Sequence, residues 1–433
     1  MGFCVSHSTG VMSDQHFSQS SQSVIAQAQE QARAYQKIGV IGMGYVGLPT
    51  ALLFARHGFE VFGVDTSEKA LSGITEGRVG DLYPELAPWW VEVQAQEKAC
   101  FKVGPKPAAC DVFLITVPTP VHEEKKTCDL AAVRAASEAL VPVLGKNNIV
   151  ILESTVPPGT TRNVVAPILE KSGLKAGEDF HLCFSPERIL PGNTIHELVN
   201  NHRVLGSANP QSAELARAVL QQVVKGEIYL TDDKTAEFCK LAENTYRDVN
   251  IALANELSIL ADDYGVEMKE AIRLINMHPR VKLLKPGIGV GGHCIAVDPW
   301  FFVEVSPDKT PLIATSRQVN DRMPYYCADK IMAEVSGIQN PKIACVGLTY
   351  KPDVGDTRES PAMKIVEILR YRNFDVVTYD PLLPEYAGQT LYDVVKDADC
   401  LAVLVNHSVV SEELILNQSK IENLMRTPHI RVF

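Results

Sequence analysis

The sequence lacks most of the features that mark a specialised class of protein. None of its 10 cysteines is spaced as C-x-x-C and its 11 histidines show no zinc-ligand spacing, so we expect free thiols and no bound metal. The longest apolar runs, such as Val112–Val117 and Leu401–Val405, have the length of strands and are too short to cross a bilayer. The first residues show neither the basic nor the apolar region of a secretion signal. These absences predict a cytoplasmic protein that does not span a membrane.

Positive charge is also scarce. The chain has 41 Lys and Arg residues against 52 Asp and Glu residues, a formal net charge of −11. This balance argues against nucleic acid or an anionic membrane as the main partner. It does not argue against a phosphorylated ligand, because backbone N–H groups bind phosphate in acidic proteins too. With 433 residues, 46% of them hydrophobic, the chain is long enough for two or three domains with their own cores.

The first 36 residues differ in composition from the rest of the chain. They are rich in Ser and Gln. We expect them to form a poorly ordered tail, with a short helix over residues 24–34. Regular structure is expected from Lys37 onward.

A dinucleotide-binding pattern begins at this point. The apolar run Ile38–Ile41 leads into Gly42-Met43-Gly44-Tyr45-Val46-Gly47, then into an apolar-periodic stretch at 48–57 and a second run that ends at Asp65. Placed between a strand and a helix, these glycines let the backbone approach a pyrophosphate, and an acidic residue about 20 positions further on accepts hydrogen bonds from the ribose. No Arg follows Asp65 at once, and its carboxylate would repel a 2′-phosphate. The pattern therefore predicts NAD rather than NADP.

Three further apolar runs extend the predicted sheet, and each ends in a polar or proline-rich loop. The runs are Val112–Val117, Ile149–Leu152 and His181–Phe184, and the loops cover residues 116–120, 153–155 and 185–188. In an open parallel sheet the carboxyl ends of the strands line the ligand crevice. We therefore expect these loops, with their hydroxyl, carboxylate and guanidinium groups, to form walls of an active site.

A long helix is predicted to follow the capping signal at residues 231–233 and to run to about Tyr264, before Gly265. At 1.5 Å per residue it would span on the order of 45 Å. Lys240 and Asn244 lie four positions apart and therefore share one face of this helix. Without further context, a solvated stripe is the more ordinary interpretation of such a pair.

Cys294 lies in a glycine-rich segment, Gly-Ile-Gly-Val-Gly-Gly-His-Cys, which starts at residue 287 and is followed by Asp298. Glycines let the backbone pass close to a ligand and adopt positive φ without a steric cost. Most cysteines are small buried apolar residues, but a thiol on such a loop is a candidate nucleophile, because a thiolate adds readily to a carbonyl carbon. The setting favours the nucleophile.

The chain then repeats its first pattern. Residues 342–347, 374–380 and 397–401 echo residues 37–42, 59–65 and 109–113. The second copy carries Thr349 and Lys351 where the first has glycines, which predicts a nucleotide-type fold with a different ligand. The expected fold class is α/β, with two Rossmann-like doubly wound domains joined by a long central helix. We place the first domain at 37–233, a central helical region with the cysteine loop at 234–335, and the second domain at 336–433.

Seven segments together resemble one family. They are GMGYVG (42–47), VPTP (117–120), ESTVPPGTT (153–161), SPERILPGN (185–193), CKLAENTYRDVN (239–250), GVGGHCIAVDP (289–299) and YKPDVGDTRESPA (350–362). This set, which spans essentially all of residues 37–433, resembles the UDP-glucose/GDP-mannose dehydrogenase family.

Within the family, the stretch 235–303 and the segment 187–192 most resemble the members that oxidise UDP-N-acetyl-D-mannosamine at C6. UDP-glucose enzymes typically carry Phe-Pro-Lys-Asp after the cysteine, whereas this chain has Ile295–Phe301. The chain stops at Phe433, where relatives usually finish a last strand and a short tail.

The resemblance implies a four-electron oxidation of a sugar alcohol to a carboxylate with two NAD, and it implies a role for each matching residue. Cys294 would form a thiohemiacetal and then a thioester, while Lys240 and Asn244 would stabilise the oxyanion. Asp298 and Thr155 would hold the water that takes the alcohol proton, and Glu187 would assist hydrolysis of the thioester. The residues implied to bind NAD are Gly42, Gly44, Tyr45, Val46, Gly47, Asp65, Pro118, Thr119 and Thr155.

The resemblance also implies how the substrate is held. The second Rossmann-like domain would bind the UDP-sugar, and Arg280 would reach the substrate of a neighbouring subunit in a homodimer or larger homo-oligomer. The substrate-binding residues implied are Glu187, Arg188, Lys240, Asn244, Arg280, Gly291, Lys351 and Arg358. For Lys351 and Arg358, ordinary surface salt bridges are the competing interpretation.

Three alternatives remain at this point. One is the same reaction on UDP-N-acetylglucosamine or UDP-glucose. A second is a two-electron β-hydroxyacid dehydrogenase, which shares a Rossmann domain and a helical middle with a catalytic lysine but needs neither a cysteine loop nor a second nucleotide fold. A third, a non-catalytic nucleotide-binding protein, is disfavoured by the joint presence of Lys240, Asn244, Cys294 and Asp298.

Overall fold

The computed structural model describes residues 19–96, 101–122, 124–189 and 193–433. Its contacts divide the chain into two compact units. The first holds the described residues of 1–118, 131–154 and 158–237, and the second holds those of 119–130, 155–157 and 238–433. The central region and the C-terminal domain, which we predicted as separate domains, thus fall in one unit. No helix among the described residues is long and apolar enough to cross a membrane.

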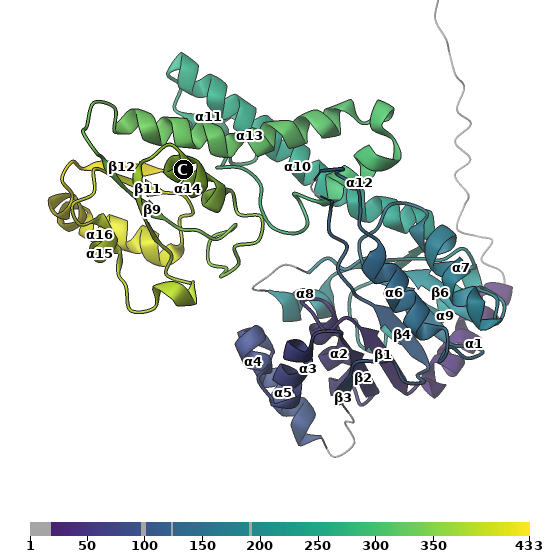
Figure 1. The fold of residues 1–433 in the computed structure, drawn as a ribbon. Coiled ribbons are helices and arrows are strands. Elements are labelled where there is room, and N and C mark those ends of the chain that lie inside the picture. Colours follow the sequence, from purple (N-terminus) through teal and green to yellow (C-terminus); the bar gives the residue numbers. More distant parts are fainter. Residues whose placement is uncertain (1–18, 97–100, 123, 190–192) are drawn as a thin grey trace, which may run out of the picture. The chain divides into compact units, whose positions relative to one another are not determined.

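The first unit is built on an eight-stranded sheet with the strand order β3-β2-β1-β4-β5-β6-β7-β8 (Figure 1). Neighbouring strands are parallel except for β6 and β7. The predicted strands are confirmed at β1, β2, β4, β5 and β6. The bounds are β1 Lys37–Ile41, β2 Glu60–Val64, β3 Phe101–Gly104, β4 Val112–Ile115, β5 Ile149–Leu152, β6 His181–Phe184, β7 Arg203–Gly206 and β8 Ile228–Thr231.

Helices bury the apolar side chains of this sheet. Side chains of α1, α2, α5, α8 and α9 form one core cluster with residues of β1, β2, β4, β5 and β6. The strands β4 and β5 are buried along their whole length, as expected for a sheet covered on both faces. The helix bounds are α1 Gln19–Ala34, α2 Gly47–Arg56, α3 Glu68–Thr75, α4 Val79–Leu82, α5 Ala87–Ala95, α6 Ala131–Leu140, α7 Ala166–Leu169, α8 Thr194–Asn200 and α9 Pro210–Leu220.

The predicted short helix over residues 24–34 is confirmed and begins earlier, whereas the prediction of poor order is wrong for the part of residues 1–36 that the structure describes. Residues 19–34 form α1, which packs along α9. Ala28 and Ala32 are buried in the core, and the Tyr35 hydroxyl donates to the backbone oxygen of Asn147 at 2.7 Å. The amphipathic spacing of these small apolar residues gives the helix a face to bury. Residues 1–18 lie outside the described residues.

The second unit contains the long helix and the cysteine loop. The long helix is confirmed as α10 (Asp233–Tyr264), whose first turns belong to the first unit; α11 (Met268–Ile275), α12 (Asp298–Val305) and α13 (Pro311–Glu334) follow. Leu241 of α10 is fully buried against Phe301 and Phe302 of the same chain. Other large side chains of α10 are exposed and form a line along the helix, the exposed apolar line: Phe238, Tyr246, Leu253, Leu260 and Tyr264.

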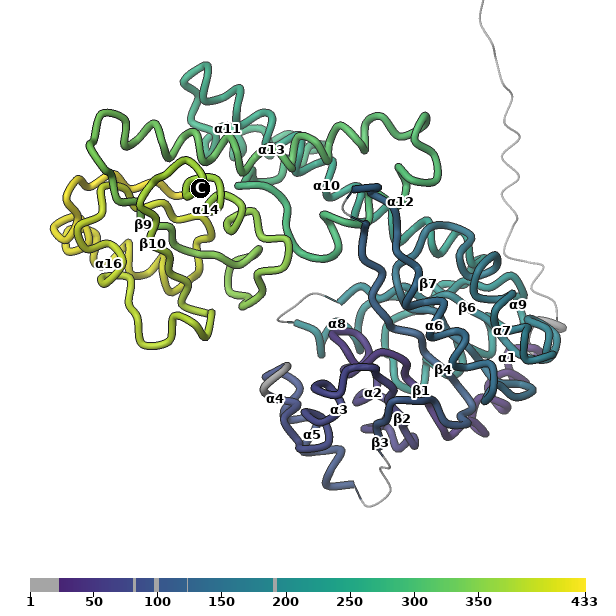
Figure 2. The backbone as a smooth tube through the Cα atoms, viewed as in Figure 1, coloured from purple at the N-terminus to yellow at the C-terminus, as the bar shows by residue number. Residues whose placement is uncertain are grey.

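The C-terminal part of this unit, at the yellow end of the colour scale in Figure 2, forms a second and smaller sheet. Its strands, in the order β10-β9-β11-β12, are all parallel. Lys342 pairs with Asp375 as Lys37 pairs with Glu60, so the sequence repeat is also a repeat of register. The bounds are β9 Lys342–Val346, α14 Pro361–Tyr371, β10 Asp375–Tyr379, α15 Leu391–Val395, β11 Cys400–Val403, α16 Ser408–Leu424 and β12 His429–Val432.

Candidate active site

The glycine turn after β1 has the geometry that a dinucleotide requires. Gly42 adopts φ +98°, and a Cβ placed on Gly47 would lie 1.8 Å from the Gly42 oxygen, so both positions need glycine for the turn and for the close approach of α2. A Cβ on Gly44 would meet nothing within 4 Å, which leaves that backbone open to a ligand. Tyr45 lies beside Tyr83, and its hydroxyl is 3.2 Å from that of Thr194. The adjacent Val46 is partly buried.

Asp65 closes the same turn at the end of β2. Its two carboxylate oxygens accept from the backbone N–H groups of Met43 and Ser67, both at 2.8 Å. Each oxygen keeps a second lone pair, so the carboxylate can still accept from a ribose hydroxyl. The residues present therefore fit NAD.

Asp380 occupies the equivalent position in the second copy and is used differently. It is fully buried and accepts from the backbone N–H of Leu348 at 2.6 Å, while His407 Nε2 lies 3.0 Å from it. Its carboxylate is thus hydrogen-bonded within the domain and is not presented to a ligand. This supports the prediction that the second fold takes a different ligand.

The cysteine loop is shaped by its glycines. Gly289 and Gly292 have φ +130° and +81°, and the Gly292 N–H donates to the Arg358 oxygen at 3.1 Å. A Cβ on Gly291 would lie 2.5 Å from the Glu359 oxygen, and one on Gly292 would lie 3.0 Å from the Tyr350 ring. Only glycine lets the loop pack this closely on residues 350–361.

The structure brings together four of the predicted catalytic residues in the second unit. The Cys294 oxygen accepts from the N–H of Asp298 at 2.8 Å, so the loop turns there into α12. Asn244 Nδ2 donates to Asp298 Oδ2 at 2.5 Å. Lys240, one turn earlier on α10, is buried, as are Asn244 and Asp298, while Cys294 is partly exposed.

Burial tunes the ionisation of the acid and the thiol. Burial raises the pKa of Asp298 to about 6, against the opposing effects of the Lys240 charge and the Asn244 hydrogen bond. Burial, helped by the charge of Asp298, raises the pKa of Cys294 to about 11, while Lys240 and Arg358 lower it. The site therefore holds a carboxylate suited to general base catalysis near neutral pH and a thiol that is protonated until a base removes its proton.

Thr155, the fifth predicted catalytic residue, also belongs to the second unit. Its backbone oxygen accepts from the Thr119 hydroxyl at 2.7 Å, which ties together two loops that we predicted to contact NAD. Pro118, the neighbouring predicted cofactor residue, belongs to the first unit.

Glu187 and Arg188 lie in the first unit, where Glu187 is part of a buried ionic cluster that sequence reasoning missed. Glu187 Oε1 accepts from the Arg188 N–H at 2.6 Å. Arg203, at the start of β7, places Nη1 3.6 Å from Glu153 Oε1 and Nη2 3.6 Å from Glu187 Oε2. Burial raises the pKa of Glu153 to about 8, with Arg203 opposing and Glu187 adding to the shift. Glu153 directly follows the buried strand β5, two residues before Thr155. An acid in that position is the sequence feature that could have indicated this cluster.

The remaining predicted substrate residues differ in their surroundings. Arg358 is exposed and binds Asp356 through Nε at 3.0 Å and Nη2 at 2.7 Å, which agrees with the salt-bridge interpretation; its charge still lowers the pKa of Cys294. Lys351 is partly buried, and its backbone oxygen accepts from the Thr349 hydroxyl at 3.0 Å. Arg280 is exposed beyond α11.

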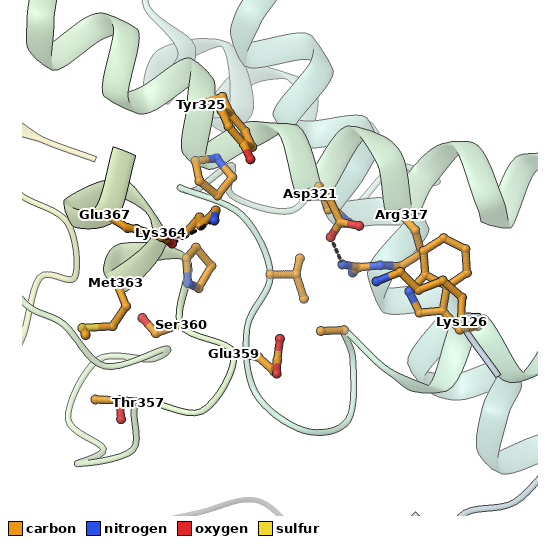
Figure 3. Close-up of a pocket in the computed structure, with 16 residues that line it drawn as sticks. Lys126, Arg317, Asp321, Tyr325, Thr357, Glu359, Ser360, Met363, Lys364 and Glu367 are labelled. Atoms are coloured by element: carbon orange, nitrogen blue, oxygen red, sulfur yellow. Dashed lines mark hydrogen bonds and ion pairs between the residues drawn. The ribbon is translucent and has the colours of Figure 1, made fainter. Parts of the chain in front are cut away.

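A cavity of about 690 Å³ is lined by Val290 and Ala296, which flank Cys294 in the sequence, and by residues that include several of α13 and α14 (Figure 3). Cys294 is not among its lining residues. Two of its cationic side chains are already paired: Arg317 with Asp248 and Asp321, and Lys364 with Glu367. These two cations are therefore poorly placed to bind a further anion, and the catalytic groups lie elsewhere.

A dinucleotide turn closed by an acid, a second nucleotide fold and a cysteine near Lys, Asn and Asp are typical of an NAD-dependent oxidoreductase that works on a nucleotide-linked substrate. Three family models match the chain: the NAD binding domain of the UDP-glucose/GDP-mannose dehydrogenase family at residues 36–224, the central domain at 234–322 and the UDP binding domain at 344–432. The chain belongs to this family and is an NAD-dependent nucleotide-sugar dehydrogenase.

Several relatives share most of their length with this chain. It is 42% identical over 399 residues to the UDP-N-acetyl-D-mannosamine dehydrogenase of Methanococcus vannielii, covering 90% of this chain and 91% of that one. It is 39% identical over 388 residues to the NDP-N-acetyl-D-galactosaminuronic acid dehydrogenase of Ralstonia solanacearum, covering 86% and 91%. The solved UDP-D-ManNAc dehydrogenase of Pyrococcus horikoshii superposes with a TM-score of 0.86 at 40% identity, over 92% of this chain and 94% of that one.

Proposed function

We propose that this protein oxidises C6 of UDP-N-acetyl-D-mannosamine to the carboxylate, yielding UDP-N-acetyl-D-mannosaminuronate. The observation that carries the proposal is the joint placement of Lys240, Asn244, Cys294 and Asp298 in one unit. The names of the relatives from Methanococcus vannielii and Pyrococcus horikoshii support this choice of sugar. NAD, when bound, accepts a hydride in each of the two oxidations.

The first oxidation removes a proton from the C6 hydroxyl and a hydride from C6. Asp298 serves as the base, acting through a water that Thr155 helps to hold. With its pKa near 6, the Asp298 carboxylate is ionised at neutral pH and still basic enough to accept the proton. Lys240 and Asn244 donate toward the oxygen on which negative charge develops.

The second oxidation needs a nucleophile to add to the aldehyde, because only the tetrahedral adduct has an oxygen whose electrons can expel the hydride. Cys294 adds its sulfur to the aldehyde and gives up its proton, forming a thiohemiacetal. Loss of hydride from that carbon and of the proton from its hydroxyl oxygen leaves a thioester. Glu187 assists the water that hydrolyses the thioester, which releases the acid and restores the thiol.

Substrate binding uses residues from several parts of the chain. Lys351 and Arg358 belong to the UDP binding domain and contact the UDP-sugar there, and the glycine backbone at Gly291 lets the sugar approach the thiol. Arg188 adds a contact to the sugar. Arg280 completes the site of a second subunit in a homodimer, and the exposed apolar line on α10 is a surface that a second copy can bury.

A substrate panel tests the choice of sugar. Purified protein is assayed with NAD and UDP-N-acetyl-D-mannosamine, UDP-N-acetylglucosamine, UDP-N-acetylgalactosamine and UDP-glucose. We expect kcat/KM to be highest for the mannosamine sugar. A higher value for another epimer would overturn the proposed substrate and leave the family chemistry in place.

A further inference from the structure

The buried cluster of Glu153, Arg203 and Glu187 contains two carboxyl groups and one guanidinium group. The carboxyls follow two adjacent strands: Glu153 comes after β5, and Glu187 stands three residues beyond β6. The guanidinium of Arg203 lies 3.6 Å from an oxygen of each, and its Nη2 donates to the Leu198 oxygen at 3.0 Å. One positive charge therefore faces two carboxyl groups inside the protein.

The two carboxyls are not equally supported. Glu187 accepts a backbone hydrogen bond on Oε1, whereas neither oxygen of Glu153 accepts a hydrogen bond from any described residue. The side chain of Glu153 is 0% exposed, compared with 10% for Glu187. A buried carboxylate without donors is costly, and protonation removes that cost. Of the two acids, Glu153 is the one that takes up the proton.

When Glu153 is neutral, the positive charge of Arg203 interacts with the Glu187 carboxylate alone. The charged groups that act on Glu153 are Arg203 and Glu187, and burial raises its pKa to about 8, so it is mostly neutral at pH 7. If Glu153 loses its proton, its carboxylate competes for the same guanidinium from the more buried position. Glu187 Oε2, which accepts no hydrogen bond from the described residues, then loses its cationic neighbour.

We propose that Glu153 is a positioning residue for Glu187. When Glu153 is neutral, the guanidinium of Arg203 orients the Glu187 carboxylate. When Glu153 is ionised, it draws that guanidinium away from Glu187. The inference rests on the proposed role of Glu187 in hydrolysing the thioester. Hydrolysis should therefore slow as pH rises through the range in which Glu153 ionises, by about tenfold between pH 7 and pH 9 for a single group titrating near pH 8.

The test follows NADH in the first turnovers of the purified enzyme with saturating UDP-N-acetyl-D-mannosamine and NAD. At pH 9 the wild type should release a burst of about two NADH per active site and then turn over slowly, and intact-mass spectrometry should detect the acyl-enzyme. In Glu153→Gln, which stays neutral, the ratio of hydrolysis rates at pH 7 and pH 9 should fall to about one. A wild-type ratio near one, or the same ratio in both proteins, would overturn the inference.

A second variant separates this inference from the function on which it depends. Glu187→Gln should accumulate acyl-enzyme already at pH 7. If it hydrolyses the thioester at the wild-type rate, the role of Glu187 is wrong whatever Glu153 does. Glu187→Gln can instead accumulate acyl-enzyme while wild type and Glu153→Gln show the same ratio of hydrolysis rates at pH 7 and pH 9. In that case only the role of Glu153 is wrong.

A spectroscopic readout is independent of turnover. The infrared carbonyl band of a protonated carboxylic acid should be present in the wild type at pH 7, disappear with an apparent pKa near 8, and be missing from Glu153→Gln. Absence of the band from folded wild-type protein at pH 7 would show that Glu153 is ionised and would contradict the proposal.

Discussion

Cys294 should react slowly with alkylating agents in the free enzyme, although it is the nucleophile of the reaction. Burial and the Asp298 charge raise the pKa of its thiol from the usual 9.0 to about 11. At pH 8 the thiolate fraction is then about a hundredfold lower than for an ordinary cysteine. A thiolate of higher pKa is intrinsically more nucleophilic, which recovers roughly a factor of ten. The net rate should be about tenfold below that of glutathione.

The assay is the rate of iodoacetamide modification at Cys294, followed by peptide mass spectrometry between pH 7 and pH 10, with Cys294→Ser to assign the site. The rate should rise about tenfold per pH unit across this range. Asp298→Asn removes the negative charge that raises the pKa and should speed modification, whereas Lys240→Met should slow it. A rate that is already at its plateau by pH 8 would show a thiolate in the resting enzyme and would refute the need for a base.

Three further predictions address other parts of the molecule. Asp65→Ser should weaken NAD binding and reduce discrimination against NADP, because it removes both the ribose acceptor and the repulsion of a 2′-phosphate; unchanged kinetics with both cofactors would place Asp65 away from the ribose. Glu153 has a folded-state pKa of about 8 against an ordinary 4.5, so wild-type stability should fall as pH rises from about 4.5 to about 8, by up to about 5 kcal/mol at 1.36 kcal/mol per pKa unit. Glu153→Gln should lack this loss in urea unfolding, and parallel stability curves for the two proteins would exclude a buried neutral acid. Mixing Arg280→Ala with Cys294→Ser protein under subunit exchange should restore activity that neither has alone, and no recovery despite demonstrated exchange would rule out a site shared between subunits.

Local patterns predicted much of the fold. The strand at Lys37–Ile41, the glycine turn and the acid at Asp65 lie close together in sequence, so their spacing alone indicates a βαβ unit. The long helix α10 was visible from its capping signal and its length. The repeat at 342–380 could be predicted because both copies keep the same apolar strands. The structure shows that the paired strands of the two copies also have the same register.

Other features depend on residues that only the fold brings together. Leu241 and Phe301 are far apart in the chain, so the sequence did not indicate which apolar residues of α10 pack within the chain and which are exposed. The ion pairs of Arg203 with Glu153 and Glu187 were not predicted for the same reason. Arg203 lies on β7, which is distant in sequence and pairs antiparallel with β6. The composition of residues 1–36, rich in Ser and Gln, indicated the short helix but not its packing: Ala28 and Ala32 are buried, and α1 packs along α9.

The four-electron reaction through Cys294 is the central claim, and the yield of NADH per sugar tests it most directly. A limiting amount of UDP-N-acetyl-D-mannosamine is converted to completion with excess NAD, NADH is measured by absorbance, and an aldehyde-trapping hydrazine is included in a parallel sample. The proposed mechanism predicts two NADH and one UDP-N-acetyl-D-mannosaminuronate per sugar, with no trapped aldehyde. One NADH per sugar, or aldehyde captured in solution, would contradict it.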